Sequence, residues 1–486
     1  MIRTNNEKYR QTTQQKRRER AIWGALTVLL LSVVLAFTLT PALLAEERTE
    51  TDRVIDVFES VFRFIERNYV DEVDPNLLLE GALKGMFDVL DDPYSAYLTA
   101  DQMRGLTDTT TGEFGGVGMY ISKQRSVEGD ERSGFVEVVS PIEDTPAYRA
   151  GVRAGDLIVA LRDETDDEFQ STEGLSIDEA VDRLRGAPGT LVTIRIRRGT
   201  RAEFPITLER AIIEVPTVKY AMMADDIGFL RVIQFTPRTA ARIEDAIAFF
   251  TENNYRGMIM DLRSNPGGLL DAVIDAADLF FSGGTIVGTA GRIPQENQRF
   301  TATRGQVVDE DVPIVVLIDG GAASAAEIFA GTLQDRGRAH LVGETTFGKG
   351  SVQQIRRIAG GGFRLTMSRY YLPSGRYIDR VGVEPDTVVR PPQLTDEQEE
   401  HYARLRTGDR VEEFVRRNRT PSDSRIDEFV VTLQDEGYDI PDRWIRRMVR
   451  DEVNRQNNVQ LDYDLEFDVV LQEALGLLQG GDVPER

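Results

Sequence analysis

Cysteine is absent from this sequence of 486 residues, and histidine occurs only twice, as His340 and His401. The lack of cysteine excludes a thiol nucleophile, a disulfide framework and any cysteine-ligated metal or iron–sulfur site. Two imidazoles 61 positions apart do not form a local cluster, so an imidazole base is a poor candidate. Acid–base chemistry in this chain is therefore expected to use lysine or carboxylates.

Positive charge is outnumbered, with 58 lysine and arginine residues against 81 aspartate and glutamate residues, and the net charge of the chain is −23. This balance argues against nucleic acid as a partner, because phosphates would be repelled; solubility is the simplest explanation of the acidic surface. The hydrophobic fraction of 41% and the charged fraction of 29% are typical of a folded protein. The length allows roughly two to four domains.

Charge is lacking altogether from Ala21 to Ala45, a run of 25 residues. A helix of this length spans a bilayer core. Seven basic residues precede it within residues 1–20, which would keep that end in the cytoplasm and place the chain after Glu46 in the periplasm or otherwise outside the cytoplasm. We expect an uncleaved, single-pass anchor in the inner membrane. A cleaved signal peptide is the alternative, although its small-residue cleavage site is poor.

Four segments with different residue patterns follow. Residues 46–104 have helical spacing, with an amphipathic face that core packing would explain, formed by Val54, Val57, Phe58, Val61, Phe62 and Ile65. Residues 105–205 contain short strands and one helix, Ile177–Leu184, which suggests a small barrel or sandwich. From about Ile227, strands and helices alternate as in a mainly parallel sheet. Residues 393–486 are charged and helical.

The stretch GETTFGKGS, Gly343–Ser351, nearly matches a phosphate-binding loop. Gly350 stands where the loop requires a hydroxyl. The residues that follow alternate as a β-hairpin, whereas phosphate binding needs a helix directly after the lysine. A nucleotide site is therefore disfavoured, and Lys349 is either a surface lysine in a glycine turn or a catalytic base.

Two further turns carry groups suited to hydrolysis. A buried strand ends at Asp319 and leads to Ser324 at the start of a helix, where N–H groups stabilise negative charge. A simple N-cap with Glu327 is the alternative explanation of this serine. Another strand leads into Asn265–Gly268, whose bare N–H groups suit an oxyanion hole, although an ordinary turn explains them as well. With Lys349, these groups allow a serine–lysine dyad if burial lowers the lysine pKa from about 10.4.

Taken together, these stretches resemble the C-terminal processing peptidases, the tail-specific serine proteases of family S41. The similarity extends from about residue 50 to residue 390. It is carried by DLRSNPGG (Asp261–Gly268), GAASAAEIFAGTLQDRGRAHLVGETTFGKGSVQ (Gly321–Gln353), YYLPSGRYI (370–378) and GVEPD (Gly382–Asp386). The sequence departs from the family pattern at Asp319, where asparagine is usual, and at Ala322, where serine is usual.

The resemblance implies a role for each residue of the site. Ser324 would be the nucleophile, Lys349 the general base and Gln353 the residue that orients the lysine amine. The oxyanion hole would consist of the N–H groups of Gly267 or Gly268 and of Ala325. Such chemistry needs no metal and no organic cofactor.

Residues 105–205 resemble a PDZ domain. The segment DTPAYRAGVRAGDLIVALRD, Asp144–Asp163, matches the part between the binding edge and its supporting strands. The carboxylate-binding loop, whose N–H groups would capture a peptide C-terminus beside an added strand, would consist of Phe114, Gly115, Gly116, Val117 and Gly118.

The expected fold is therefore α+β and multidomain. Its parts are a basic cytoplasmic segment (1–20), a transmembrane anchor or signal (21–45), a helical N-terminal region (46–104), a PDZ domain (105–205), an α/β, crotonase-like serine peptidase core (206–392) and a helical C-terminal region (393–486). The expected function is a membrane-anchored endopeptidase that binds protein or peptide substrates by their C-termini.

Two alternatives from other classes remain. One is a non-catalytic PDZ adaptor that only captures tails; the other is an acyl-chain hydratase, for which no coenzyme A site is found. The apolar spacing of Val469, Leu471 and Leu475 suggests that the last region mediates assembly with another copy or with an adaptor protein.

Overall fold

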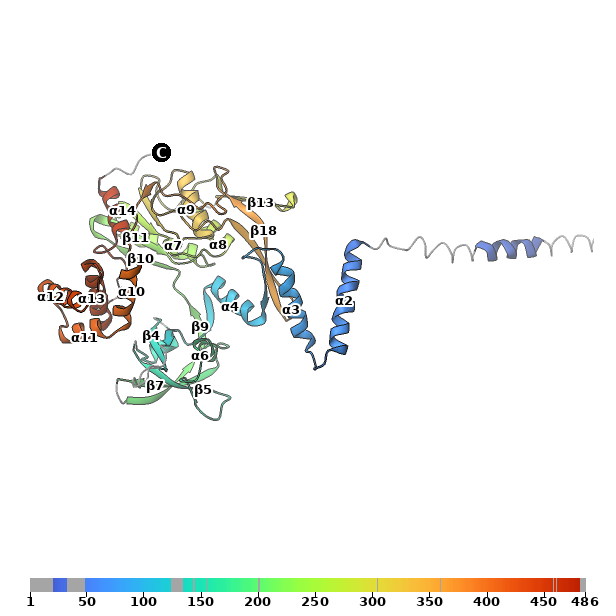
Figure 1. Ribbon diagram of the computed structural model, residues 1–486. Coiled ribbons are helices and arrows are strands. Elements are labelled where there is room, and N and C mark those ends of the chain that lie inside the picture. The colour runs from blue at the N-terminus through green and yellow to red at the C-terminus, as the bar shows by residue number, and fades with distance from the viewer. Residues whose placement is uncertain are drawn as a thin grey trace, which may run out of the picture. The chain divides into compact units, whose positions relative to one another are not determined.

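The computed structural model of the chain describes residues 21–32 and 49–480, apart from gaps at residues 124–133, 143–144, 154, 200–201, 304, 359, 458 and 460. The chain divides into two compact units, Met1–Val89 and Leu90–Arg486. Figure 1 shows their helices and strands. Each unit is described by itself.

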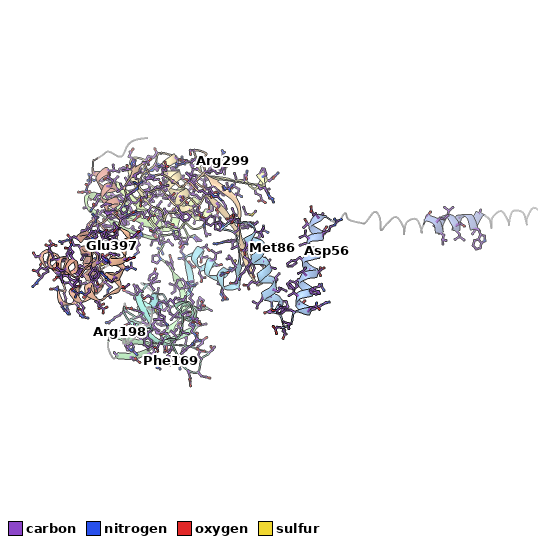
Figure 2. All side chains as sticks on the ribbon, viewed as in Figure 1. Asp56, Met86, Phe169, Arg198, Arg299 and Glu397 are labelled. Carbon is purple, nitrogen blue, oxygen red and sulfur yellow. The ribbon has the colours of Figure 1, made fainter. Side chains whose placement is uncertain are left out.

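The described part of the first unit is helical. Residues 21–32 form a helix, followed by α2 (Glu50–Asn68) and α3 (Pro75–Asp88). Neither α2 nor α3 has a buried residue, and Met86 of α3, labelled in Figure 2, is 65% exposed. The core packing expected for the apolar face of α2 is therefore not observed. Amphipathic spacing predicts such a face, but not the surface that covers it.

The predicted membrane anchor is only partly covered by the structure. Among the described residues, no helix is both long enough and apolar enough to cross a bilayer. Of residues 21–45, those from 33 onward lie outside the described part of the chain. The anchor and its orientation therefore stay predictions.

The second unit begins with β1 (Ala96–Thr99) and α4 (Ala100–Thr111), which are followed by the segment expected to be a PDZ domain. This segment forms an antiparallel sheet in the order β3-β4-β5-β7-β8, with β6 paired to β5. Its α6 (Ile177–Leu184) has the bounds predicted from the sequence and packs on the buried strand residues. The other elements are β3 (Met119–Lys123), β4 (Val136–Pro141), α5 (Pro146–Arg149), β5 (Leu157–Asp163), β6 (Gln170–Ser171), β7 (Leu191–Arg198) and β8 (Ala202–Glu209).

Two further sets of strands belong to the second unit. β2 (Glu113–Gly116) pairs with β9 (Ala211–Glu214) as a two-stranded ribbon. The segment after Lys349 is the predicted hairpin, since β17 (Ser351–Ile358) and β18 (Gly361–Tyr371) pair antiparallel. The sheet around β18 is completed by β1 (Ala96–Thr99), β13 (Thr285–Gly291) and β14 (Arg299–Thr301).

The central sheet has six strands in the order β10-β11-β12-β15-β16-β19. β10 is antiparallel to β11, and the remaining pairs are parallel, so the predicted mainly parallel α/β sheet is confirmed. Its elements are β10 (Val218–Met222), β11 (Ile227–Val232), α7 (Thr239–Glu252), β12 (Gly257–Asp261), α8 (Leu270–Asp278), β15 (Ile314–Ile318), α9 (Ala325–Asp335), β16 (His340–Gly343) and β19 (Thr387–Val388).

Alternate residues of these strands enter two different cores. Leu230, Met260 and Val316 pack with α7, α8 and α9 on one face. Phe229, Ile259 and Leu317 pack on the other face against α14 (Val469–Gly480), the last helix of the chain. The period of two along each strand produces this division.

The packing of α14 explains the apolar spacing that suggested assembly. Val470, Leu471 and Ala474 are buried against the central sheet of the same chain, with Val469 and Leu475 beside them. The spacing therefore gives no support to a second copy or an adaptor, and the oligomeric state stays a prediction. The preceding helices form a core of their own; they are α10 (Asp396–Thr407), α11 (Arg410–Arg417), α12 (Asp423–Asp435) and α13 (Asp442–Gln456).

Candidate active site

Ser324 lies in the turn between β15 and α9, at the N-terminus of the helix. Its side chain is 7% exposed, and its backbone has φ 56° and ψ −114°. A positive φ is costly for a residue with a Cβ, and such strain is concentrated at functional turns. The strand-to-helix turn places the serine beside the unpaired N–H groups of the first helical turn.

The hydroxyl of Ser324 is within hydrogen-bond distance of one other side chain in the described part of the molecule. Its Oγ lies 3.4 Å from the hydroxyl of Tyr370, a buried residue of β18. Burial raises the pKa of the Tyr370 phenol, so this group stays protonated and can donate a hydrogen bond at neutral pH. Sequence analysis did not identify Tyr370, although it begins the YYLPSGRYI stretch.

Glu327 connects the two halves of the site. This carboxylate is fully buried and accepts hydrogen bonds from the backbone N–H groups of Ser324 (2.8 Å), Gly348 (2.7 Å) and Lys349 (2.8 Å). A fourth bond comes from the Thr346 hydroxyl (2.5 Å). The N-cap explanation described only the first of these bonds. The carboxylate brings together two residues that are 25 positions apart.

Lys349 is partly buried and carries a perturbed amine. Burial lowers the pKa of Lys349, the positive charge of Arg364 lowers it further, and the Glu327 carboxylate opposes both effects. The direction is the one that a lysine base requires. The amine Nζ lies 4.8 Å from the centre of the Tyr94 ring, a contact that favours its protonated form.

The predicted catalytic groups are near one another but are not joined. In the part of the chain that the structure describes, no hydrogen bond links the Lys349 amine to the Ser324 hydroxyl or to Gln353. The Gln353 amide Nε2 donates instead to Ser351 Oγ at 2.8 Å and, more weakly, to Thr366 Oγ1 at 3.5 Å. The arrangement contains the residue types of a serine–lysine site, but the Lys349 amine contacts the Tyr94 ring.

The turn after β12 lies directly against Ser324. A Cβ on Gly267 would come within 2.8 Å of the Ser324 Cβ, so glycine is needed for this approach. The Gly267 N–H, however, donates to Asn265 Oδ1 at 2.8 Å. Among the described residues, the N–H groups of Gly268 and Ala325 have no hydrogen-bond partner. Of the predicted oxyanion donors, these two are available and Gly267 is occupied.

Asp319, one of the departures from the family pattern, has a structural role. Its Oδ1 accepts the N–H groups of Ser264, Gly321 and Ala322. A carboxylate oxygen suits this position because every partner is a donor. The bonds join the turn after β12 to the turn that leads to the serine.

The predicted carboxylate-binding loop divides into two parts. Phe114, Gly115 and Gly116 belong to β2 and pair with β9, while Val117 and Gly118 follow the strand. Among the described residues, the N–H groups of Val117 and Gly118 have no hydrogen-bond partner. Gly118 has φ 79°, and a Cβ there would lie 2.3 Å from the Thr145 Cβ. Two N–H groups are thus available for a ligand carboxylate.

A strained serine at a helix N-terminus, a desolvated lysine and unpaired backbone N–H groups are the features of a hydrolase of the serine protease class. Family comparisons agree. Residues 226–389 match peptidase family S41, residues 137–198 match the PDZ domain, and residues 41–102 match the activating protease CtpB N-terminal domain.

Similar proteins include the carboxy-terminal-processing protease of Bartonella bacilliformis, which is 42% identical over 341 residues, covering 69% of this chain and 75% of that protein. The carboxy-terminal processing protease CtpA of Bacillus subtilis is 31% identical over 373 residues, covering 75% and 77%. A solved structure, the photosystem II D1 C-terminal processing protease, is 28% identical and covers 70% of this chain and 93% of that one, with a TM-score of 0.40. The chain belongs to peptidase family S41, among the C-terminal processing serine proteases.

Replacing Glu327 with glutamine is expected to lower kcat/KM by about ten- to a hundredfold, because an amide cannot accept all four bonds that hold the two turns. Steady-state peptide cleavage measures the effect. Glu344→Gln is the matched control, since the Glu344 carboxylate lies in the same stretch but, among the described residues, is paired only with Arg390, at 4.0 Å. Equal losses in both variants would contradict this role of Glu327.

Replacing Arg364 with glutamine is expected to raise the pKa of Lys349, because a positive charge that disfavours the ammonium form is removed. A lysine base acts in its neutral form, so cleavage that depends on Lys349 as the base rises with pH through this pKa. The rising limb of the pH–rate profile should move to higher pH. Arg364→Lys retains the charge and should leave the limb in place; a limb that moves equally in both variants would refute the electrostatic explanation.

Proposed function

We propose that this chain is a serine endopeptidase in which Ser324 is the nucleophile, Lys349 the general base and Gln353 the residue that orients the lysine amine. Family membership supports the reaction class. The dyad is assigned on one observation. The buried carboxylate of Glu327 accepts the backbone N–H groups of both Ser324 and Lys349 and so holds the two residues together.

The reaction follows acyl-enzyme chemistry. Neutral Lys349 takes the proton of the Ser324 hydroxyl as Oγ attacks the scissile carbonyl, and the N–H groups of Gly268 and Ala325 stabilise the oxyanion. The lysine then returns the proton to the leaving amine. Water, deprotonated by the same amine, hydrolyses the acyl ester and restores the serine.

The proposal requires one movement of the lysine. The Lys349 amine contacts the Tyr94 ring and must leave it to reach the Ser324 hydroxyl. A lysine side chain has four rotatable bonds and makes such a change without displacement of the backbone. The described arrangement then corresponds to a resting form of the enzyme.

The PDZ domain supports recognition of substrates by their C-termini. The unpaired N–H groups of Val117 and Gly118 are donors for a terminal carboxylate, and β3 is an edge strand to which an extended peptide can add. Residues 21–45 would anchor the protein in the inner membrane with its catalytic part in the periplasm or otherwise outside the cytoplasm. That location rests on the uncharged stretch and the basic residues before it.

The test is cleavage of an unfolded protein by residues 46–486, between about pH 6 and pH 10, on both sides of the range expected for a lowered lysine pKa. Ser324→Ala and Lys349→Ala should each abolish cleavage, by at least about a thousandfold. Unchanged folding by circular dichroism is the control. Cleavage that survives Lys349→Ala would remove this lysine from the mechanism. Binding of tails without any cleavage would favour the adaptor.

Amidation of the substrate C-terminus is expected to lower kcat/KM by about tenfold or more, because charge-assisted bonds to the terminal carboxylate are lost. The comparison uses one peptide sequence with a free and with an amidated end. Equal cleavage of the two peptides would argue against tail recognition through the Val117–Gly118 N–H groups.

A further inference from the structure

An arginine clamp lies immediately before the turn that holds the oxyanion donors. Arg263 follows β12, and its guanidinium donates to Asp261 (2.9 Å from Nε, 2.8 Å from Nη2) and to Asp468 (2.9 Å from Nη1, 2.6 Å from Nη2). Both carboxylates bind it through two bonds. Burial alone would lower the pKa of Arg263, but these bonds outweigh it and raise that pKa, so the guanidinium stays charged.

Asp468 comes from the far end of the chain, 205 residues after Arg263. Its Oδ1 also accepts the N–H groups of Val470 and Leu471 and thereby caps α14. Because α14 is packed on the central sheet through Leu471 and Ala474, the carboxylate has a fixed position. The match to peptidase family S41 ends at residue 389, so it does not include this partner.

The backbone after Arg263 leads directly to the oxyanion donors. Ser264 has a positive φ of 57°, and its N–H is held by Asp319. Asn265 is fully buried: its Nδ2 donates to Val232 O, and its carbonyl accepts the Ala323 N–H. Gly267 then contacts Ser324, and Gly268 follows. The backbone position of Arg263 is therefore one of the constraints on the distance between Gly268 and Ser324.

The clamp borders a cavity of about 630 Å³ that Asp261, Arg263, Ser264 and Asp468 help to line. If the Asp468 carboxylate is lost, Nη1 loses its acceptor and a charged guanidinium is left with half of its pairing. Water or a new side-chain rotamer would then have to supply the missing acceptor for the guanidinium, and a new rotamer of Arg263 would displace the backbone of the short turn that follows.

We propose that Asp468 is a positioning residue for catalysis, which sets the oxyanion turn Ser264–Gly268 through Arg263. The inference rests on the proposed function of Gly268 and Ala325 as oxyanion donors. It assigns a catalytic consequence to the C-terminal segment: the α14 cap and the oxyanion turn are held by one carboxylate. The segment Asp468–Gly480 then contributes to the peptidase site, although it lies beyond the residues that match the family.

The test replaces Asp468 with asparagine in the full chain. Asparagine keeps the Oδ1 that caps α14 and accepts Arg263 Nη1, but it puts an NH2 group opposite Arg263 Nη2 and removes the negative charge, so the two-bond pairing is broken while the cap remains. Because oxyanion donors act in the transition state, kcat should fall by about ten- to a hundredfold while KM changes little. Hydrogen–deuterium exchange of the backbone in residues 262–269 should become faster.

Asp464→Asn is a closely matched control. The Asp464 carboxylate binds Arg450 through two bonds, of 2.6 and 2.9 Å, and accepts the N–H groups of Glu466 and Phe467. The side chains of this pair are 20% and 19% exposed, against 19% and 18% for Arg263 and Asp468. Both pairs line the same cavity, but the control does not touch the oxyanion turn. Asp464→Asn should leave kcat and the exchange of residues 262–269 unchanged.

Equal effects of the two substitutions on kcat, or unchanged exchange in residues 262–269 of Asp468→Asn, would overturn the inference. Should Asp468→Asn not fold, Asp468→Glu retains the charge but displaces the carboxylate by one methylene, and it is expected to show faster exchange in residues 262–269 and a lower kcat than the parent; parent-like kcat and exchange would overturn the inference. If the parent chain cleaves no peptide under any condition, the proposed function fails. The exchange of residues 262–269 then decides by itself whether Asp468 holds the turn.

Discussion

The buried carboxylate of Glu327 is the interaction on which the site depends. Four donors converge on it, and two of them are the backbone N–H groups of Ser324 and Lys349. A buried carboxylate is stable only when its acceptors are filled, so the turn before α9 and the turn after β16 must be placed together. The relative position of the Ser324 and Lys349 backbones therefore follows from the hydrogen bonds that one buried group requires.

The same principle extends outward from the serine. Asp319 joins the serine turn to the turn after β12, and Arg263 joins that turn to Asp468 at the cap of α14. In each of these contacts a carboxylate accepts hydrogen bonds from backbone N–H groups or from a guanidinium. The contacts lie at the carboxyl ends of the parallel strands, where functional groups gather in such folds. The peptidase core is accordingly built from segments separated by the α10–α13 helices, which have their own core.

The fold brings the residues of the candidate site together without joining their side chains by hydrogen bonds in the described part of the chain. Ser324, Lys349 and Gln353 are in one site, yet the Lys349 amine contacts Tyr94 and the Gln353 amide binds Ser351 and Thr366. Tyr94 is held by the turn in which Asp92 accepts the Ser95 hydroxyl and Ser95 accepts the Thr366 N–H. The proposed dyad therefore requires the Lys349 and Gln353 side chains to leave these contacts.

The sequence was sufficient to predict the alternation of strands and helices, the hairpin after Lys349 and the helix Ile177–Leu184, because these depend on local periodicity and turn residues. It also supplied the residue types of the candidate site, since Ser324, Lys349 and Gly267–Gly268 stand in recognisable motifs. The folded structure was needed to learn that Glu327 binds two turns, that the Gly267 N–H donates to Asn265, and that Leu471 packs on the central sheet of its own chain. These outcomes depend on partners tens to hundreds of positions away, and periodicity along the chain carries no information about which distant groups fill a buried hydrogen bond or cover an apolar face.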